Sequence, residues 1–215
     1  MSSIQWVSLG AWLLILFWQF PRDFWPKLRY DSSYQHLVCA TTLVLGVLWS
    51  IQAGINDGLN LHFLMLTTIV LCHGWRIAMW LCLLPTLFLV YFGKLPLADT
   101  GVYAVSHYLI PGLFSYLLFL LSYRYLQRHL FIYIFIAGFL AAALTICLQL
   151  LLSSLLLFLD GRYDWQTITD NYLLFALLIW FPEALLNGAA VTLMAIYRPE
   201  WLRTFYDREY LSAER

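Results

Sequence analysis

Charged side chains are scarce in this sequence: Asp, Glu, Lys and Arg make up 11% of its 215 residues, against roughly a quarter in an average soluble domain. Hydrophobic residues make up 62%, and the mean hydropathy is +0.75. A small water-soluble domain leaves much of its area exposed and has no way to hide so much apolar surface. The scarcity of charge therefore excludes an ordinary soluble protein and predicts a chain whose solvent is lipid.

An excess of basic charge, catalytic signatures and paired cysteines are also missing. The formal net charge is zero, so nothing suggests a nucleic-acid partner. The sequence has no GxSxG, HExxH or P-loop motif and no flexible linker, so we expect one transmembrane domain over residues 1–215 that is not an enzyme. The cysteines form no CxxC pair and lie in apolar runs, where we interpret them as small core residues: Cys39, Cys72, Cys82 and Cys147.

Long apolar runs, in contrast, are abundant. A helix needs about 20 mostly apolar residues to cross the hydrocarbon core of a bilayer. The runs predict an all-α, polytopic integral membrane protein with about seven transmembrane helices. The third is short, so it has little tilt or a partly re-entrant start, and the sixth is long enough to bend or tilt. The predicted spans are residues 4–20, 36–55, 59–74, 77–93, 102–123, 131–159 and 172–197.

The basic residues predict the orientation of these spans. With the N-terminus outside and the C-terminus inside, only Lys94 and Arg162 among the twelve Lys and Arg residues lie in outer segments. Basic residues favour cytoplasmic loops, so we expect this orientation in the inner (plasma) membrane of a bacterium. The inner segments are residues 21–35, 75–76, 124–130 and the tail from 198.

Histidines in or beside the spans are candidates for chemistry, because lipid excludes polar side chains that have no role. His36, His73 and His129 lie at inner ends of spans, where we expect interfacial, structural roles. His62 and His107 lie just inside the outer ends of the third and fifth spans. A neutral imidazole there can bind a metal ion that arrives from outside; the alternative is a histidine hydrogen-bonded to a neighbouring helix.

A polar turn precedes His62. Asp57 can attract a cation to the outer face, and the side-chain amides of Asn56 and Asn60 can orient a ligand. The alternative is that Asn, Asp and Gly stand here because they are good turn formers.

Glu183 is the one acidic residue deep in a predicted span. It follows Pro182, and Asn187 lies one turn further along. A buried carboxyl group must be paired, protonated or functional, and we favour a packing or gating role here over catalysis. Gly138 and Ala142 form a small-xxx-small pair that predicts close helix packing in the sixth span.

Two segments resemble the CbiM/NikM family. Gly58-Leu-Asn-Leu-His62-Phe-Leu, followed after nine residues by Gly74-Trp75 and then Ile77-Ala78, is similar to the family's Gly-Thr-Ser-x-His-Leu-Leu and Gly-Pro-Trp-x-Ala stretch. The segment Pro182-Glu183-Ala-Leu-Leu-Asn187-Gly188-Ala-Ala-Val-Thr192 resembles the family's late helix, which carries an acidic residue, a nearby Gly and a Thr.

Members of this family are the substrate-specific membrane components of energy-coupling-factor (ECF) transporters for cobalt and nickel. The resemblance implies uptake of a transition-metal ion as substrate, with no permanently bound cofactor. It also implies association with an energy-coupling transmembrane protein and cytoplasmic ATPase subunits.

The resemblance further implies that His62 is a metal ligand. The family's other ligands are the N-terminal amine, the second backbone nitrogen and a histidine side chain at position two, a nitrogen set suited to nickel or low-spin cobalt. This sequence has Ser2 instead. Either another residue substitutes, or the metal differs, or the site is lost. His107 is our candidate substitute, on topology alone.

Three functions therefore compete. The first is a metal-uptake membrane component of an ECF transporter. The second is a membrane protein that keeps the family fold without metal transport and acts as an assembly or scaffolding factor. The third, an intramembrane enzyme using His62, His107 and Glu183, ranks last because Glu183 lies near mid-span while both histidines lie near the outer face.

Overall fold

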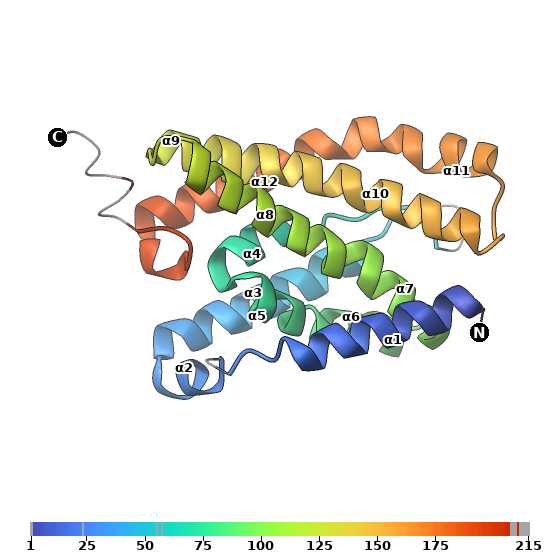
Figure 1. The fold of residues 1–215 in the computed structure, drawn as a ribbon, viewed down its shortest axis with the longest axis horizontal. Helices are drawn as coiled ribbons and strands as arrows, with labels where there is room; N and C mark the ends of the chain where they lie inside the picture. Colours follow the sequence, from blue (N-terminus) through green and yellow to red (C-terminus); the bar gives the residue numbers. More distant parts are fainter. Residues whose placement is uncertain (1, 23, 55, 57, 207–209, 211–215) are drawn as a thin grey trace.

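The apolar runs form helices that lie roughly along one long axis (Figure 1). The computed structural model describes residues 2–22, 24–54, 56, 58–206 and 210. Within those residues every named element is a helix, and extended pairing is limited to one bridge between Ala53 and Leu61. The prediction of an all-α protein is confirmed for this part of the chain.

The helices follow one another along the chain with short connections. In order they are α1 (Ser3–Trp18), α2 (Phe24–Tyr30), α3 (Ser32–Ser50), α4 (Leu66–His73), α5 (Trp75–Leu81), α6 (Leu83–Tyr91), α7 (Thr100–Ala104), α8 (Ile110–Tyr125), α9 (Leu130–Ile132), α10 (Ala141–Leu159), α11 (Trp165–Asn171) and α12 (Ala176–Tyr197). Two π-helical stretches, Val105–Leu109 and Tyr133–Leu140, connect α7 to α8 and α9 to α10.

Three continuous helices of the described chain are long and apolar enough to cross a membrane, by length and composition. They are Leu97–Tyr125, Leu130–Leu159 and Trp165–Tyr197, and they contain the fifth, sixth and seventh predicted spans almost entirely. Ser3–Trp18 and Trp75–Tyr91 are shorter apolar helices at the first and fourth predicted spans. Large apolar side chains point outward along the bundle, as a lipid-facing surface requires; examples are Val7, Phe17, Leu178 and Leu193.

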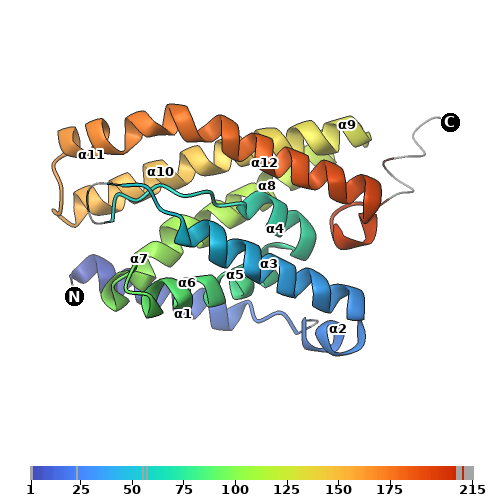
Figure 2. The ribbon, with the colours of Figure 1, turned by 180° about the vertical axis from the view of Figure 1, so that it is seen from behind.

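The third predicted span differs from the expected helix. Only Leu66–His73 is helical, and residues 59–65 are not. Figure 2 shows this segment leaving the region after α3 and running back along the bundle to α4. Eight helical residues rise only about 12 Å, so the extended stretch supplies the rest of the length. The alternative of a partly re-entrant start describes this segment better than a continuous helix.

Smaller differences affect the second and fourth predicted spans. In the second predicted span, helix α3 ends at Ser50 and not near residue 55, because the chain changes to an extended conformation there. The fourth is divided at Cys82 into α5 and α6. Gly74, with a φ of 77°, makes the tight connection between α4 and α5, a backbone conformation that favours glycine.

His73 is the last residue of α4 and lies in the protein core, and its placement at the membrane interface stays a prediction. Its side chain is fully buried. One ring nitrogen lies 3.2 Å from the Tyr34 hydroxyl and the other lies 3.0 Å from the Thr41 hydroxyl. The expected structural role is consistent with these two contacts.

Close packing occurs where small residues face a neighbouring helix. A Cβ atom built on Gly138 would lie 3.4 Å from Cβ of Val191 in α12, which agrees with the predicted close approach of the sixth span. An even closer approach between two helices joins α7 to α1. A Cβ atom on Gly101 would lie 2.5 Å from the backbone nitrogen of Leu9 and 2.6 Å from its Cα.

Candidate functional site

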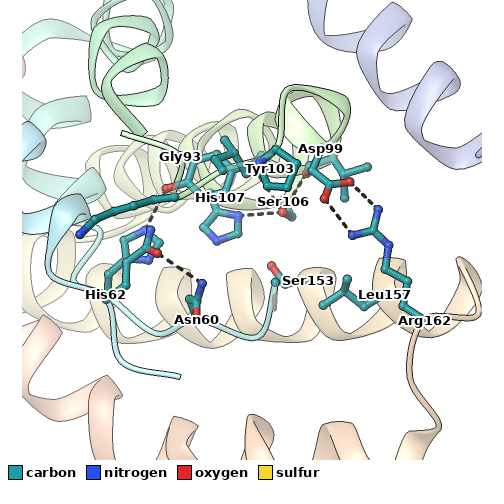
Figure 3. Close-up of a pocket in the computed structure, with 16 residues that line it drawn as sticks. Asn60, His62, Gly93, Asp99, Tyr103, Ser106, His107, Ser153, Leu157 and Arg162 are labelled. Carbon is teal, nitrogen blue, oxygen red and sulfur yellow. Dashed lines mark hydrogen bonds and ion pairs between the residues drawn. The ribbon is translucent and has the colours of Figure 1, made fainter. Parts of the chain in front are cut away.

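A cavity of about 430 Å³ opens near the end of the bundle where α1 begins. Its walls come from the extended segment after α3, from residues 93–107 and from α10 and the turn that follows it. His62 and His107 lie together at one end of the cavity, and Asp99 and Arg162 lie at the other (Figure 3). Asn60 lies beside His62, and Ser153 lies between the two ends.

The two histidines pack with nearly parallel rings. Their ring centroids are 5.3 Å apart, and the ring planes differ by 2°. Tyr103, one turn before His107, stacks on it with centroids 3.9 Å apart. The indole of Trp49 meets the His62 ring edge-on at 5.9 Å. The structure thus brings together the two residues that topology alone had placed on the same face.

Hydrogen bonds leave one imidazole nitrogen of His62 unused. Its Nε2 lies 3.1 Å from the Tyr103 hydroxyl, whereas none of the described residues supplies a partner for its buried Nδ1. His107 Nδ1 lies 2.8 Å from the Ser106 hydroxyl. A buried polar atom without a partner is costly. In the tautomer whose Nε2–H donates to Tyr103, the Nδ1 lone pair of His62 is free to bind a metal ion.

The described part of the chain contains no group of three or more His, Cys, Asp or Glu side chains arranged to hold a metal ion. Two imidazoles are therefore the side-chain donors that the cavity offers most clearly. Transition-metal sites in proteins take four or more ligands. A metal bound here needs further donors from outside this pair.

The remaining predicted site residues have different positions. Asn60 lines the cavity and donates from Nδ2 to the Gln52 side-chain oxygen at 3.3 Å. The carbonyl oxygen of Asn56 accepts a hydrogen bond from the Leu59 N–H at 3.1 Å, which is turn chemistry. Asp57 lies outside the described residues. Neither Glu183 nor Asn187 lines the cavity.

Glu183 and Asn187 hold the beginning of α4 instead. The Glu183 carboxyl oxygens accept the N–H groups of Leu64 at 3.0 Å and Met65 at 2.7 Å. The Asn187 side-chain oxygen accepts the Thr68 N–H at 2.9 Å, and its amide donates to Glu183 Oε1 at 2.9 Å. The first turn of a helix has N–H groups without partners, so α12 caps α4 across the helix interface.

This cap also fixes the segment that carries His62. Leu64 is two residues after His62, and both its backbone N–H and its backbone carbonyl group are hydrogen-bonded. Its N–H bonds Glu183, and its carbonyl oxygen accepts the indole N–H of Trp49 at 3.2 Å. Met65 has a left-handed backbone with a φ of 52°, which a non-glycine residue adopts only when its surroundings impose it. Glu183 therefore acts on the site through the backbone.

The other end of α4 is capped by the segment after α12. The backbone N–H groups of Arg203 and Thr204 each donate at 3.3 Å, to the carbonyl oxygens of Cys72 and Leu71. The Thr204 hydroxyl donates to the same Leu71 oxygen at 3.0 Å. Both ends of this eight-residue helix thus receive hydrogen bonds from the last part of the chain.

At the far end of the cavity, Asp99 and Arg162 form an ion pair. Arg162 donates through both terminal nitrogens to Asp99, one bond measuring 2.9 Å, and through Nε to Asp160 at 2.7 Å. Gln5 of α1 donates to Asp99 at 2.6 Å. The hydrogen bonds from Arg162 to Asp99, and then those to Asp160, raise the pKa of its guanidinium above its ordinary value. Arg162 is therefore a permanent positive charge here.

Several of these residues did not emerge from the sequence. Tyr103 precedes His107 by four positions, the spacing that places two side chains on one face of a helix, and that signal was available. Arg162 stands out as one of two basic residues in outer segments, but its pairing with Asp99 joins positions 63 residues apart. No local pattern predicts such a pair.

Comparisons with known proteins now identify the family. A sequence model described as cobalt uptake substrate-specific transmembrane region, CbiM, matches residues 3–201. No curated protein and no solved structure matches the chain. The match covers nearly all of the sequence, and the family is one of transport components. The resemblance found in the two short motifs is confirmed: the chain belongs to the CbiM family of cobalt uptake transmembrane proteins.

Proposed function

We propose that the chain is the substrate-specific component of an ECF transporter that takes up cobalt or a chemically similar transition-metal ion such as nickel. The ion binds at His62 and His107. The observation that carries the proposal is the buried Nδ1 of His62, which has no partner among the described residues, beside a second imidazole at 5.3 Å. Imidazole nitrogens suit cobalt and nickel.

The proposed topology has seven spans, with α1 beginning outside and α12 ending inside. Successive segments run in alternating directions along the bundle (Figures 1 and 2), which supports this count. The end opposite the cavity carries Lys27, Arg29, Arg124 and Arg198, as an inner face should. The cavity then faces the outside of a bacterial inner membrane, and metal reaches His62 from there.

Energy for uptake must come from other subunits in this proposal. The sequence has no P-loop or other nucleotide-binding motif. We therefore expect an energy-coupling transmembrane protein and cytoplasmic ATPase subunits as partners. If the purified chain alone drives gradient-coupled cobalt uptake in proteoliposomes, the ECF assignment gives way to a secondary transporter.

The decisive experiment measures cobalt bound to the purified chain. His62→Ala and His107→Ala should each lower the affinity by more than the roughly 10–100-fold that outer-shell partners cost. His129→Ala is the matched control, because that histidine lies at the opposite end of the bundle and its ring nitrogen accepts a local backbone bond. A His62→Ala protein that binds cobalt like the parent would remove the assignment of the site.

A second function has one observation in its favour. Ser2, at the position where the family has a histidine ligand, is committed to a capping box with Gln5 at the start of α1. A cavity whose described residues provide two neighbouring imidazoles, but no group of three ligating side chains, also fits a protein that kept the fold without metal transport and serves as an assembly or scaffolding factor. Absence of bound cobalt in parent and variants alike would favour that function.

A further inference from the structure

A serine next to His107 bears on which of its ring nitrogens carries the proton. Ser106 and His107 are neighbours in the π-helical stretch Val105–Leu109, and both side chains are buried. The Oγ atom of Ser106 lies 2.8 Å from Nδ1 of His107. A neutral imidazole has one N–H donor and one acceptor nitrogen. The contact therefore fits two tautomers, one in which the hydroxyl donates to Nδ1 and one in which Nδ1–H donates to the hydroxyl.

The second hydrogen bond of the Ser106 hydroxyl distinguishes these tautomers. The hydroxyl donates to the carbonyl oxygen of Val102, four residues earlier, at 2.9 Å, and the carbonyl oxygen of Tyr103 is 3.4 Å away. A carbonyl oxygen can only accept, and a hydroxyl has a single proton to donate. Because that proton is directed at Val102, the Ser106 oxygen accepts from the ring. His107 then carries its proton on Nδ1, and its lone pair is on Nε2.

The cavity gives access to Nε2 of His107. No hydrogen bond of the described residues uses this atom, and it is not one of the fully buried polar atoms without a partner. His107 lines the cavity beside His62 (Figure 3). Tyr103 stacks on the His107 ring with centroids 3.9 Å apart, and rotating the ring about its Cβ–Cγ bond would break this contact. The orientation of the lone pair is therefore fixed by packing.

No comparable contact fixes the tautomer of His62. Its Nε2 lies 3.1 Å from the Tyr103 hydroxyl, and a phenol hydroxyl both donates and accepts. Among the described residues, this hydroxyl makes no further hydrogen bond that would direct its proton. Either tautomer of His62 is compatible with the contact. The two histidines of the cavity thus differ, because only His107 has a neighbour whose own proton is already directed elsewhere.

We propose that Ser106 is a positioning residue for metal binding, which holds His107 with its proton on Nδ1 and so makes Nε2 the ligand atom. This inference rests on the proposed function and adds the ligand atom and the residue that prepares it. A histidine that binds a metal usually donates its other ring N–H to an outer partner, which fixes the ring and raises the basicity of the ligand nitrogen. Ser106, oriented by Val102, is that partner for His107.

Nitrogen NMR of the purified full chain tests the tautomer directly. The protein is isotopically labelled in its histidine rings, kept free of metal in detergent, and measured at a pH at which the imidazoles are neutral. Loss of signals in His107→Gln identifies those of His107. The proton should be on Nδ1 of His107 in the parent. A proton on Nε2 would overturn the inference and leave the proposed function standing, because metal binding is measured separately.

Variants of Ser106 connect the tautomer to metal binding. Ser106→Ala removes the acceptor of Nδ1–H, so the preference for this tautomer should be lost and the affinity for cobalt should fall roughly 10–100-fold. Ser106→Thr keeps a hydroxyl that can bond the carbonyl group four residues earlier and should recover both. Ser154→Ala is the matched control, because Ser154 is also buried and donates to the carbonyl oxygen four residues earlier, at 2.7 Å, but does not line the cavity.

The outcomes separate the two proposals. An unchanged tautomer in Ser106→Ala would show that Ser106 does not fix the ring. A changed tautomer with the cobalt affinity of the parent would remove Ser106 from metal binding. An equal loss of affinity in Ser154→Ala would overturn the specific role of Ser106 in favour of a general packing effect. If the parent has the Nδ1–H tautomer and binds no cobalt, the proposed function fails, and with it the role of Ser106 in metal binding.

Discussion

Replacing Glu183 with alanine tests how α12 positions the segment that carries His62. The change leaves the N–H groups of Leu64 and Met65 buried without acceptors, and Asn187 loses one of its bonds. A buried donor left without a partner costs about 1–3 kcal/mol, so the two backbone groups together predict about 2–6 kcal/mol. The side chain is 2% exposed, which keeps water from replacing the carboxyl group.

The conservative variant Glu183→Gln should lose less unfolding free energy than Glu183→Ala. Glu183→Gln keeps the size and one acceptor oxygen, but its NH₂ group meets an N–H donor, so one bond is lost at about 1–3 kcal/mol. Both variants should also lower the affinity for cobalt, because Leu64 is two residues from His62 and the cap fixes this part of the chain. Loss of stability should therefore accompany loss of binding, with Ala more severe than Gln.

The measurement is reversible unfolding in detergent followed by tryptophan fluorescence, with cobalt binding measured on the same samples. Glu200→Gln is the control, because that side chain is 52% exposed and pairs with Arg198 at the surface, where an ion pair contributes about 0–1 kcal/mol. A Glu183→Ala effect below about 0.6 kcal/mol, the average for hydrogen bonds between membrane helices, would refute the reasoning. So would reduced stability with unchanged cobalt affinity.

Two further predictions test packing and topology. Gly101→Ala places a methyl group against the Leu9 backbone and should lower the free energy of unfolding by about 1–3 kcal/mol. Gly10→Ala places its methyl group in open space within α1 and should raise the free energy of unfolding by up to about 1 kcal/mol. Equal effects of the two substitutions would contradict the close approach of α7 to α1. A reporter active only in the cytoplasm should be active when fused after Arg215 and silent when inserted within 160–171, and activity at the second position would overturn the seven-span topology.

The sequence predicted most helices because lipid requires long apolar segments to satisfy their own backbone groups. It did not predict that residues 59–65 are extended. Hydropathy reports burial, and a short apolar run is compatible with helix or extended chain. The choice depends on acceptors at Glu183 and Asn187, which lie 118 and 119 residues away from their partners.

For the candidate site, the sequence predicted the pair of histidines but not the position of Arg162. The proximity of His62 and His107 agrees with the predicted topology, which placed both residues just inside the outer ends of their spans. The role expected for Glu183 was packing or gating, and its contacts with Leu64 and Met65 are those of a helix cap. The sequence marked Arg162 as one of two basic residues in the predicted outer segments. Its position at the cavity depends on the turn after α10, whose geometry the sequence does not specify.

The two capped ends of α4 have a consequence for the order in which the protein is made. The residues that satisfy this helix, from Glu183 to Thr204, leave the ribosome more than a hundred positions after it. Until they arrive, Leu64, Met65 and Thr68 lack their acceptors and the carbonyl groups of Leu71 and Cys72 lack their donors. The wall that carries His62 therefore reaches its final form only at the end of synthesis, and a truncated product that ends before α12 leaves it unfinished.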